Sequence, residues 1–281
     1  MVTVTPIDAP CGATITGVDL TQPLSSGDVE AIRKAWLKHL VLVFPDQPMS
    51  DDDLERFTLC FGEFGHDPFF DPIDGRTNIA AIQRNADETT PLFAENWHTD
   101  WSFQETPPIG TCLLGLTIPP QGGDTFFANQ QLAYEQMPAP LKAEADSAIA
   151  IHSAETAYAP DGMYGQGKDE EQGRSMRIRS SDEARLKTRH PMVRPHTETS
   201  KPALYSTVGY IQGFEGMDKT ASDDLLLRIY HHQTQDQFVY RHKWQPNMLV
   251  MWDNRAVLHK ASGGYDGHDR LLHRTTIAER L

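Results

Sequence analysis

A histidine and an aspartate stand two positions apart between two tryptophans in the segment NWHTDWSF. On a β-strand alternate side chains share a face, so His98 and Asp100 would point the same way, about 6.6 Å apart at roughly 3.3 Å per residue. Trp97, Thr99 and Trp101 would face the other side. An imidazole and a carboxylate at this spacing can bind one metal ion, and this donor set suits Fe(II). Taken alone, a pair of this kind more often belongs to a solvated polar face, so the metal site needs further ligands.

A third ligand for this pair lies far downstream. The segment NMLVMWDNRAVLHKAS predicts a strand over 248–252, a tight Asp-Asn turn, and a second short strand that carries His259. A lone histidine among apolar neighbours is more often a structural core residue than a ligand, so both interpretations stay open. A second His-x-acid pair, His196 and Glu198, lies in HTETSKP, whose composition predicts a turn.

The segment RLLHRTTI predicts a further strand that places Arg270, Leu272, Arg274 and Thr276 on one face. Two arginines on an otherwise apolar face are costly to bury unless each meets an anion. A guanidinium group is well shaped to bind a carboxylate or sulfonate through two hydrogen bonds. Structural salt bridges are the alternative explanation in a chain with so many acidic residues.

The elements that must position these residues are expected to be mainly strands. Many short runs of β-forming residues, separated by PPQGGD, TETSKP and SGGYDGHD, indicate a barrel or a double-sheet jelly roll. Leu40–Phe44 is expected to be a buried strand. Helices are expected outside the core over residues 26–38, from Ser50 (in capping-box spacing with Asp53) to about Phe61, near 129–145 and near 222–234.

Two stretches are expected to lack regular structure. Residues 66–91 are rich in proline, aspartate and glycine, and the polar, glycine-rich residues 159–177 are expected to form a mobile loop or lid. No linker divides the chain, so residues 1–281 are expected to form a single domain.

Composition excludes several classes of partner. The 281 residues include 25 Lys and Arg against 39 Asp and Glu, a formal net charge of −14, which disfavours nucleic acid or a membrane surface as a partner. A small-molecule substrate remains compatible with this charge, and homo-oligomerisation is left open. The three cysteines form no CxxC motif, so neither a disulfide framework nor a thiolate metal site is expected. With no signal peptide and no apolar run of about 20 residues, a cytoplasmic protein is expected.

Taken in order, the motifs resemble those of the taurine dioxygenase/2,4-dichlorophenoxyacetate dioxygenase family of non-haem Fe(II)/2-oxoglutarate-dependent oxygenases. The ordered set spans nearly the whole chain: GVDLTQPLS, FGEFG, WHTD, ETPP, GGDT, VYRHKWQPN, WDNR and two arginines four residues apart. The resemblance implies a double-stranded β-helix (jelly-roll, cupin-like) core with flanking helices. It also implies Fe(II) as cofactor and 2-oxoglutarate and O2 as cosubstrates, in a hydroxylation of the EC 1.14.11 type that yields succinate and CO2.

Carried onto this chain, the resemblance makes His98, Asp100 and His259 the catalytic metal ligands. It makes Arg270 the residue that binds the distal carboxylate of 2-oxoglutarate, with help from Thr125. Halogenating relatives lack the ligand carboxylate, so the presence of Asp100 points to hydroxylation.

The prime substrate is less well defined by the resemblance. Arg274 matches the arginine that, in sulfonate-using members, binds the anionic head of the substrate. Taurine-specific members carry an H-x-x-Y segment where this chain has Asp67 to Phe70, and Ala94 stands in place of an asparagine. The sequence therefore argues against taurine and favours a sulfonate, alkyl sulfate or aryloxyalkanoate, although Asp67 with aromatic neighbours could hold a larger or cationic group. The candidate substrate-binding residues are Arg274, Asp67, Phe70, Trp101 and Tyr210.

Two alternatives from other classes stay open at this point. One is a non-redox metal-dependent hydrolase on a cupin-like barrel, which leaves Arg270 unexplained, and the other is a non-catalytic binding module of the same fold. Of the other histidines, His231 and His232 are expected at the surface of a helix end, and His152 and His190 are expected to be structural.

Overall fold

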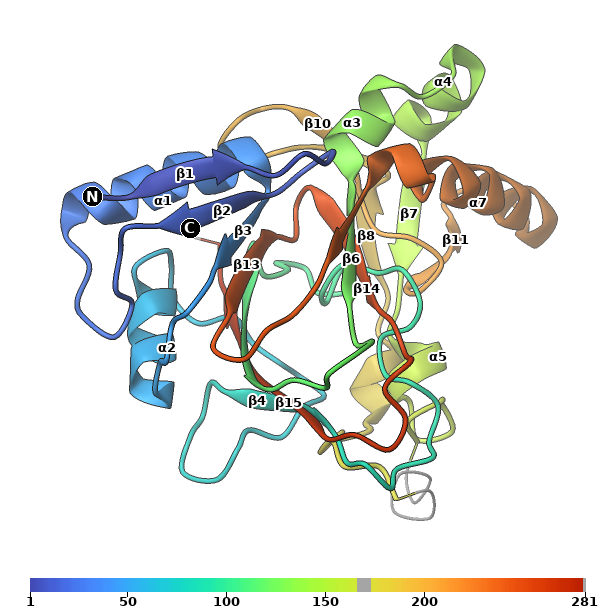
Figure 1. Ribbon diagram of the computed structural model, residues 1–281. Coiled ribbons are helices and arrows are strands. Elements are labelled where there is room, and N and C mark those ends of the chain that lie inside the picture. The colour runs from blue at the N-terminus through green and yellow to red at the C-terminus, as the bar shows by residue number, and fades with distance from the viewer. Residues whose placement is uncertain (166–172, 280–281) are drawn as a thin grey trace.

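Two facing β-sheets form the centre of the molecule (Figure 1). The computed structural model describes residues 1–165 and 173–279. The larger sheet has seven strands in the spatial order β1 (Thr3–Pro6), β2 (Ala13–Thr16), β3 (Val41–Phe44), β13 (Leu249–Asp253), β5 (Gly110–Thr117), β15 (Arg270–Ile277) and β4 (Ala80–Arg84). The smaller sheet has the order β12 (Val239–His242), β6 (Thr125–Asn129) and β14 (Val257–Ala261). Strands of both sheets line the main cavity, so the cavity lies between them.

Two further small sheets and the helices lie outside this pair. The small sheets are β11 (Ile211–Phe214), β7 (Ile149–His152) and β8 (Thr188–Pro191), and β10 (Pro202–Leu204) with β9 (Val193–Pro195). The helices are α1 (Ser26–His39), α2 (Asp51–Leu59), α3 (Gln130–Glu135), α4 (Ala139–Ser147), α5 (Glu155–Tyr158) and α7 (Lys219–Gln233), with short 3-10 turns at Asp182–Arg185 and Asp236–Phe238. The expectation of a mainly β fold with flanking helices is confirmed.

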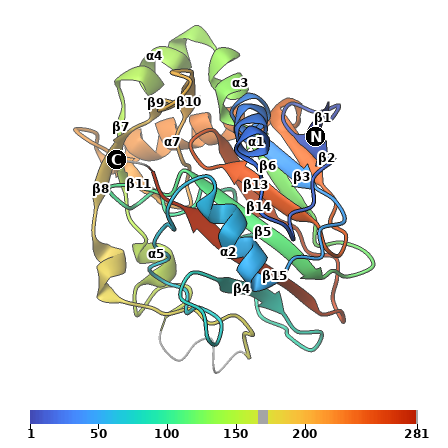
Figure 2. The same cartoon turned by 90° about the vertical axis from the view of Figure 1, so that its left-hand side faces the viewer.

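Helices α1 and α2 cover the outer face of the larger sheet (Figure 2). Helix α2 begins with the expected capping box, in which the side chains of Ser50 and Asp53 each bond the backbone N–H of the other. Such a cap contributes on the order of 1 kcal/mol. The apolar face of the helix places Leu54 and Phe57 in the core against the sheet, as the helical spacing predicts.

The structure differs from the sequence expectations at three elements. The helix expected near 129–145 is two helices, because Pro138 ends one and opens the next. The stretch expected to be irregular contains β4, which pairs with β15. His232 is buried, and its Nε2 lies 2.7 Å from the carbonyl oxygen of Ala133, so its expected surface position is wrong.

The other expectations concern single segments. The turn assigned to His196 and Glu198 is confirmed, and the ring of His196 contacts Asp253 rather than a metal site. Of the loop expected at 159–177, residues 166–172 lie outside the described residues. Among the helices of the described parts, none is both long and apolar enough to cross a membrane.

Candidate active site

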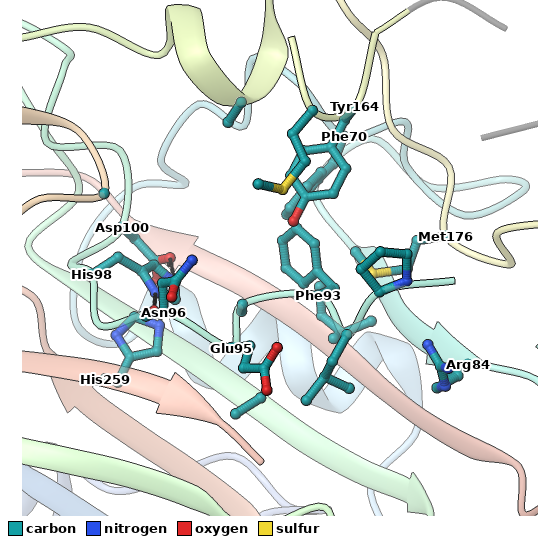
Figure 3. Close-up of a pocket in the computed structure, with 18 of the residues that line it drawn as sticks. Phe70, Arg84, Phe93, Glu95, Asn96, His98, Asp100, Tyr164, Met176 and His259 are labelled. Atoms are coloured by element: carbon teal, nitrogen blue, oxygen red, sulfur yellow. Dashed lines mark hydrogen bonds and ion pairs between the residues drawn. The ribbon is translucent and has the colours of Figure 1, made fainter. Parts of the chain in front are cut away.

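His98, Asp100 and His259 come together on the wall of a cavity of about 310 Å³ (Figure 3). Oδ1 of Asp100 lies 3.7 Å from Nε2 of His259 and 4.0 Å from Nε2 of His98. One donor atom from each residue lies within 4.8 Å of the other two. Bonds of about 2.1 Å to a shared ion need donors about 3 Å apart, so a small contraction would fit them to one metal. Two imidazoles and one carboxylate form the facial set typical of non-haem Fe(II).

The backbone around the triad is not the uninterrupted strand that the sequence predicts. His98 and His259 form a single antiparallel bridge, with N–H···O distances of 3.0 and 2.8 Å. Asp100 already lies in a turn, and Trp101 has a left-handed φ of 50°. The alternation of side chains therefore holds through Asp100 and fails at Trp101, which lines the cavity beside the ligands instead of facing away. Thr99 does point away, donating a hydrogen bond to the carbonyl of Asn254 at 2.7 Å.

Burial and hydrogen bonding put the three side chains in the protonation states that a metal needs. Nδ1 of His98 lies 2.8 Å from the carbonyl of Asn96, which makes Nδ1 the donor and leaves the lone pair on Nε2. Burial lowers the pKa of His98, and burial with the neighbouring His98 lowers the pKa of His259 to about 3. Burial alone would raise the pKa of Asp100, but Arg274 and the two histidines bring it down to about 2. The site thus presents neutral imidazoles and a carboxylate.

A chain of hydrogen bonds orients the ligand carboxylate from behind. The hydroxyl of Thr111 donates to Oδ2 of Asp100 at 2.5 Å, and Nδ2 of Asn254 donates to the Thr111 oxygen at 2.9 Å. The indole N–H of Trp252 in turn donates to Oδ1 of Asn254 at 2.9 Å. Because Oδ2 is occupied in this way, Oδ1 of Asp100 is the oxygen available to a metal.

Arg270 is a buried cation that lacks an anion. It is 6% exposed, its Nη2 donates to the carbonyl of Gly123 at 3.2 Å, and its Nε has no hydrogen-bond partner among the described residues. Gly123 has a φ of 68°, and a Cβ there would lie 3.1 Å from this Nε. Burial accordingly lowers the pKa of Arg270. A buried guanidinium with free donors is costly without a partner, so its surroundings fit an anionic group such as the distal carboxylate of 2-oxoglutarate.

Thr125 lines the same cavity as Arg270. Its hydroxyl oxygen accepts a hydrogen bond from the indole N–H of Trp244 at 2.9 Å. With the oxygen used as an acceptor, the hydroxyl hydrogen is available to donate to an anion.

Arg274, four residues further along β15, is in a different situation. Its Nη2 lies 3.0 Å from Oδ1 of Asp67 and 3.8 Å from Oδ1 of Asp100. Its guanidinium lies 5.1 Å from the ring of Phe70 and 5.0 Å from the ring of Trp101. The indole N–H of Trp101 donates to the same oxygen of Asp67. Burial raises the pKa of Asp67, opposed by the charge of Arg274.

Four of the five candidate substrate-binding residues line the cavity, namely Arg274, Phe70, Trp101 and Tyr210. The fifth, Asp67, lies behind Arg274, outside the lining.

Aromatic rings occupy the space beyond the triad. Figure 3 shows the triad at one end, Arg84 at the other, and Phe70, Phe93, Tyr164 and Met176 between them.

Several residues of the site were missed from the sequence. Nothing in the sequence around Thr111 or Tyr158 indicates a functional role, because an isolated threonine or tyrosine among apolar residues is usually part of the hydrophobic core. Asn254 could have been found, since it lies in the WDNR motif beside the Asp-Asn turn. Arg84 lies directly opposite Arg270 in the pairing of β4 with β15, which a correct assignment of β4 would have revealed.

Comparisons with known proteins agree with this geometry. Residues 3–276 match the model of the family described as "Taurine catabolism dioxygenase TauD, TfdA family". An alkylsulfatase from Acinetobacter baylyi is 33% identical over 95% of this chain and 82% of its own length. An alpha-ketoglutarate-dependent sulfate ester dioxygenase from Pseudomonas putida is 32% identical over 97% of this chain and 88% of its own. Alpha-ketoglutarate is 2-oxoglutarate.

Solved structures give the same result. A crystal structure of a taurine dioxygenase from Burkholderia xenovorans superposes with a TM-score of 0.81 at 31% identity, covering all of this chain and 92% of that one. AAD-2, solved in complex with Mn(II) and N-oxalylglycine, superposes with a TM-score of 0.79 at 26% identity, covering all of this chain and 98% of that one. The chain therefore belongs to the TauD/TfdA family, and the resemblance drawn from its motifs is confirmed. Its members are Fe(II)/2-oxoglutarate-dependent dioxygenases, which makes this chain an enzyme of that class.

Proposed function

We propose that this enzyme hydroxylates a C–H bond of a small organic substrate of the sulfonate, alkyl sulfate or aryloxyalkanoate type. One observation carries the proposal: a two-histidine, one-carboxylate cluster and a buried arginine without an anion share one cavity. Relatives named for sulfate esters and for 2,4-dichlorophenoxyacetate support the class of substrate. A non-redox hydrolase, which needs no 2-oxo acid, would leave the unpaired Arg270 without a role.

In this proposal His98, Asp100 and His259 would hold Fe(II). Bound Fe(II), with 2-oxoglutarate and O2, supplies the oxidising chemistry that yields succinate, CO2 and the hydroxylated product. Arg270 and Thr125 bind the distal carboxylate of 2-oxoglutarate and so fix its orientation.

The substrate itself is held by the inner wall of the cavity, the part beside the metal ligands formed by Phe70, Trp101, Tyr210 and Arg274. The three rings provide an apolar surface that excludes water from the reacting carbon.

The same family membership supports finer inferences about the fold and setting. We infer that the two facing sheets form the double-stranded β-helix core of the family and that residues 1–281 are one domain. A cytoplasmic location remains the proposed setting, and oligomeric state is left open.

An anaerobic titration tests the proposed metal and cosubstrate site. Fe(II) with 2-oxoglutarate should give a weak visible charge-transfer band that is lost in His98→Ala. His231→Ala, which changes an exposed histidine on α7, is the matched control and should keep the band. A folded wild-type protein without the band would contradict the proposal.

A panel of sulfonates, alkyl sulfates and aryloxyalkanoates then tests the substrate class. Succinate formation above the uncoupled background should identify the members that the enzyme accepts, and no member exceeding that background would contradict the proposed class.

A further inference from the structure

The inner wall contains a buried ion pair that the proposed reaction does not use. Nη2 of Arg274 and the indole N–H of Trp101 both donate to Oδ1 of Asp67. Arg274 is 4% exposed, and the side chain of Asp67 is 16% exposed. Convergence of a cationic donor and a second N–H on one oxygen is the environment of a carboxylate. The positive charge of Arg274 is therefore balanced before any substrate arrives.

Asp67 acts on the cavity through the two lining residues that donate to it, Arg274 and Trp101. It is absent from the cavity lining, whereas Arg274, Phe70 and Trp101 are part of it. The guanidinium is fixed between the two rings by their contacts and by Asp67. Asp67 thus determines both the position of the guanidinium and the net charge that this wall presents to a substrate.

The charges of the loaded site leave no surplus for an anion at this wall. A metal dication and dianionic 2-oxoglutarate balance each other, and the two arginines Arg270 and Arg274 together balance the two carboxylates Asp67 and Asp100, both of which lie near Arg274. A sulfonate placed against Arg274 would therefore add an unbalanced negative charge, near Asp67 and within a few ångströms of Asp100. In a buried site such a charge is strongly disfavoured.

We propose that Asp67 is a positioning residue that cancels the charge of Arg274 and thereby selects prime substrates whose reacting end is uncharged. The inference rests on the proposed function, because the reacting end is the one that lies beside the metal ligands. The reacting end is an alkyl, aryl, ester or amide group packed against Phe70 and Trp101. In a substrate of the proposed sulfonate, alkyl sulfate or aryloxyalkanoate type, the anionic group would lie away from Arg274, and the C–H bond to be hydroxylated would belong to the uncharged end of the molecule.

Matched pairs of ligands that differ only in charge test the proposal. The protein is loaded with Mn(II) and N-oxalylglycine, so that no turnover occurs, and titrated calorimetrically with methanesulfonate against methanesulfonamide and with acetate against acetamide, which are too short to place the charged group away from this wall. The wild type should bind the neutral member of each pair at least about tenfold more tightly, and Asp67→Asn should reverse the preference. The same ratio of affinities in both proteins would overturn the proposal, since a merely structural Asp67 would not change charge selectivity.

A second measurement does not depend on the metal or on finding a substrate. All proteins in this measurement carry Arg270→Gln, which removes the unpaired cation of the same cavity; methanesulfonate should then raise the Tm when Asp67→Asn is added and leave it unchanged when Asp67 is retained. Asp71→Asn removes a half-exposed carboxylate that pairs with Arg179, and with this control the Tm should also stay unchanged. Asp67→Ser replaces Asp67→Asn if the latter does not fold.

Equal Tm shifts in all proteins would overturn the role of Asp67. Failure of the wild type to bind Mn(II) with N-oxalylglycine would instead count against the proposed function, so the two failures are distinguishable.

Discussion

Two arginines on one face of β15 meet opposite surroundings. Arg270 and Arg274 are both almost fully buried and both line the cavity. Nε of both arginines lacks a hydrogen-bond partner among the described residues, but Arg270 has only a carbonyl contact, and no carboxylate of the described residues pairs with it. Arg274 has Asp67 at 3.0 Å and Asp100 at 3.8 Å.

The difference teaches that residue type and strand period set where a side chain points, whereas distant segments decide what it can bind. Asp67 reaches Arg274 from the segment after α2, and Gly123 faces Arg270 from the segment before β6. A buried charged side chain without a counter-charge indicates that a ligand supplies the counter-charge. A buried side chain whose charge is already paired instead determines how polar the neighbouring cavity surface is. The same guanidinium group is therefore a cosubstrate anchor at one position and a neutral part of the substrate wall at the other.

The largest expected effect is on 2-oxoglutarate binding. Arg270→Gln should weaken it at least about 100-fold, because a buried, bidentate guanidinium–carboxylate pair is lost. Anaerobic titration of the Fe(II)-loaded protein with 2-oxoglutarate measures the dissociation constant. Arg274→Gln is the matched control, with a change of less than about fivefold. Equal weakening in both variants would remove the functional contrast between the two arginines.

In the absence of cosubstrate, the free energy of unfolding should be affected more by the change at Arg274 than by the change at Arg270. Arg274→Gln should lower the free energy of unfolding by about 3 kcal/mol, because Asp67 is left buried without its counter-charge. Arg270→Gln should change it by less than about 1 kcal/mol or raise it, because an unpaired buried charge is removed. Urea denaturation measures both values.

The double variant Asp67→Asn/Arg274→Gln is the control for this stability contrast. It should recover most of the loss, because both charges of the pair are removed together. A greater loss in Arg270→Gln than in Arg274→Gln would contradict the assignment of the paired and unpaired cations.

Metal affinity should depend on a residue behind the triad. Thr111→Val keeps the shape of the side chain but removes the hydroxyl that holds Oδ2 of Asp100, and metal affinity should fall about 10- to 100-fold. Thr275→Val removes a buried hydroxyl that contacts Thr58 on the opposite face of β15, so it controls for the loss of a buried hydroxyl alone. Equal metal affinity in both variants would show that Thr111 does not orient the ligand.

Much of the site could be predicted because its residues lie in local patterns. The alternation of β15 places Arg270 and Arg274 on one face, and the motif order brings His259 to the pair of His98 and Asp100. The pairing of Asp67 with Arg274 could not be predicted, since 207 residues separate them and only the tertiary fold brings them together.

The other incorrect predictions also concern features that depend on tertiary structure and not on the local sequence. The strand expected through Trp101 ends early because the left-handed φ of Trp101 turns its side chain to the cavity, and nothing in the local pattern indicates a positive φ at a tryptophan. Strand β4 was missed because its propensity is weak and pairing with β15 determines its conformation. Caps and helical spacing near α2 are local, and there the prediction succeeded.

The smallest expected effect separates a neutral hydrogen bond from the charge of Arg270. Thr125→Val should weaken 2-oxoglutarate binding about fivefold, because a single neutral donor contributes about 1 kcal/mol. Thr125→Ser keeps the hydroxyl that accepts from Trp244 and should bind 2-oxoglutarate as the wild type does. Affinities measured by the same anaerobic titration should therefore fall in the order wild type, Thr125→Val, Arg270→Gln. If Thr125→Val instead weakened binding as much as Arg270→Gln, the anchor would be the hydroxyl-bearing strand β6 and not the unpaired cation, and the contrast between the two arginines would lose its explanation.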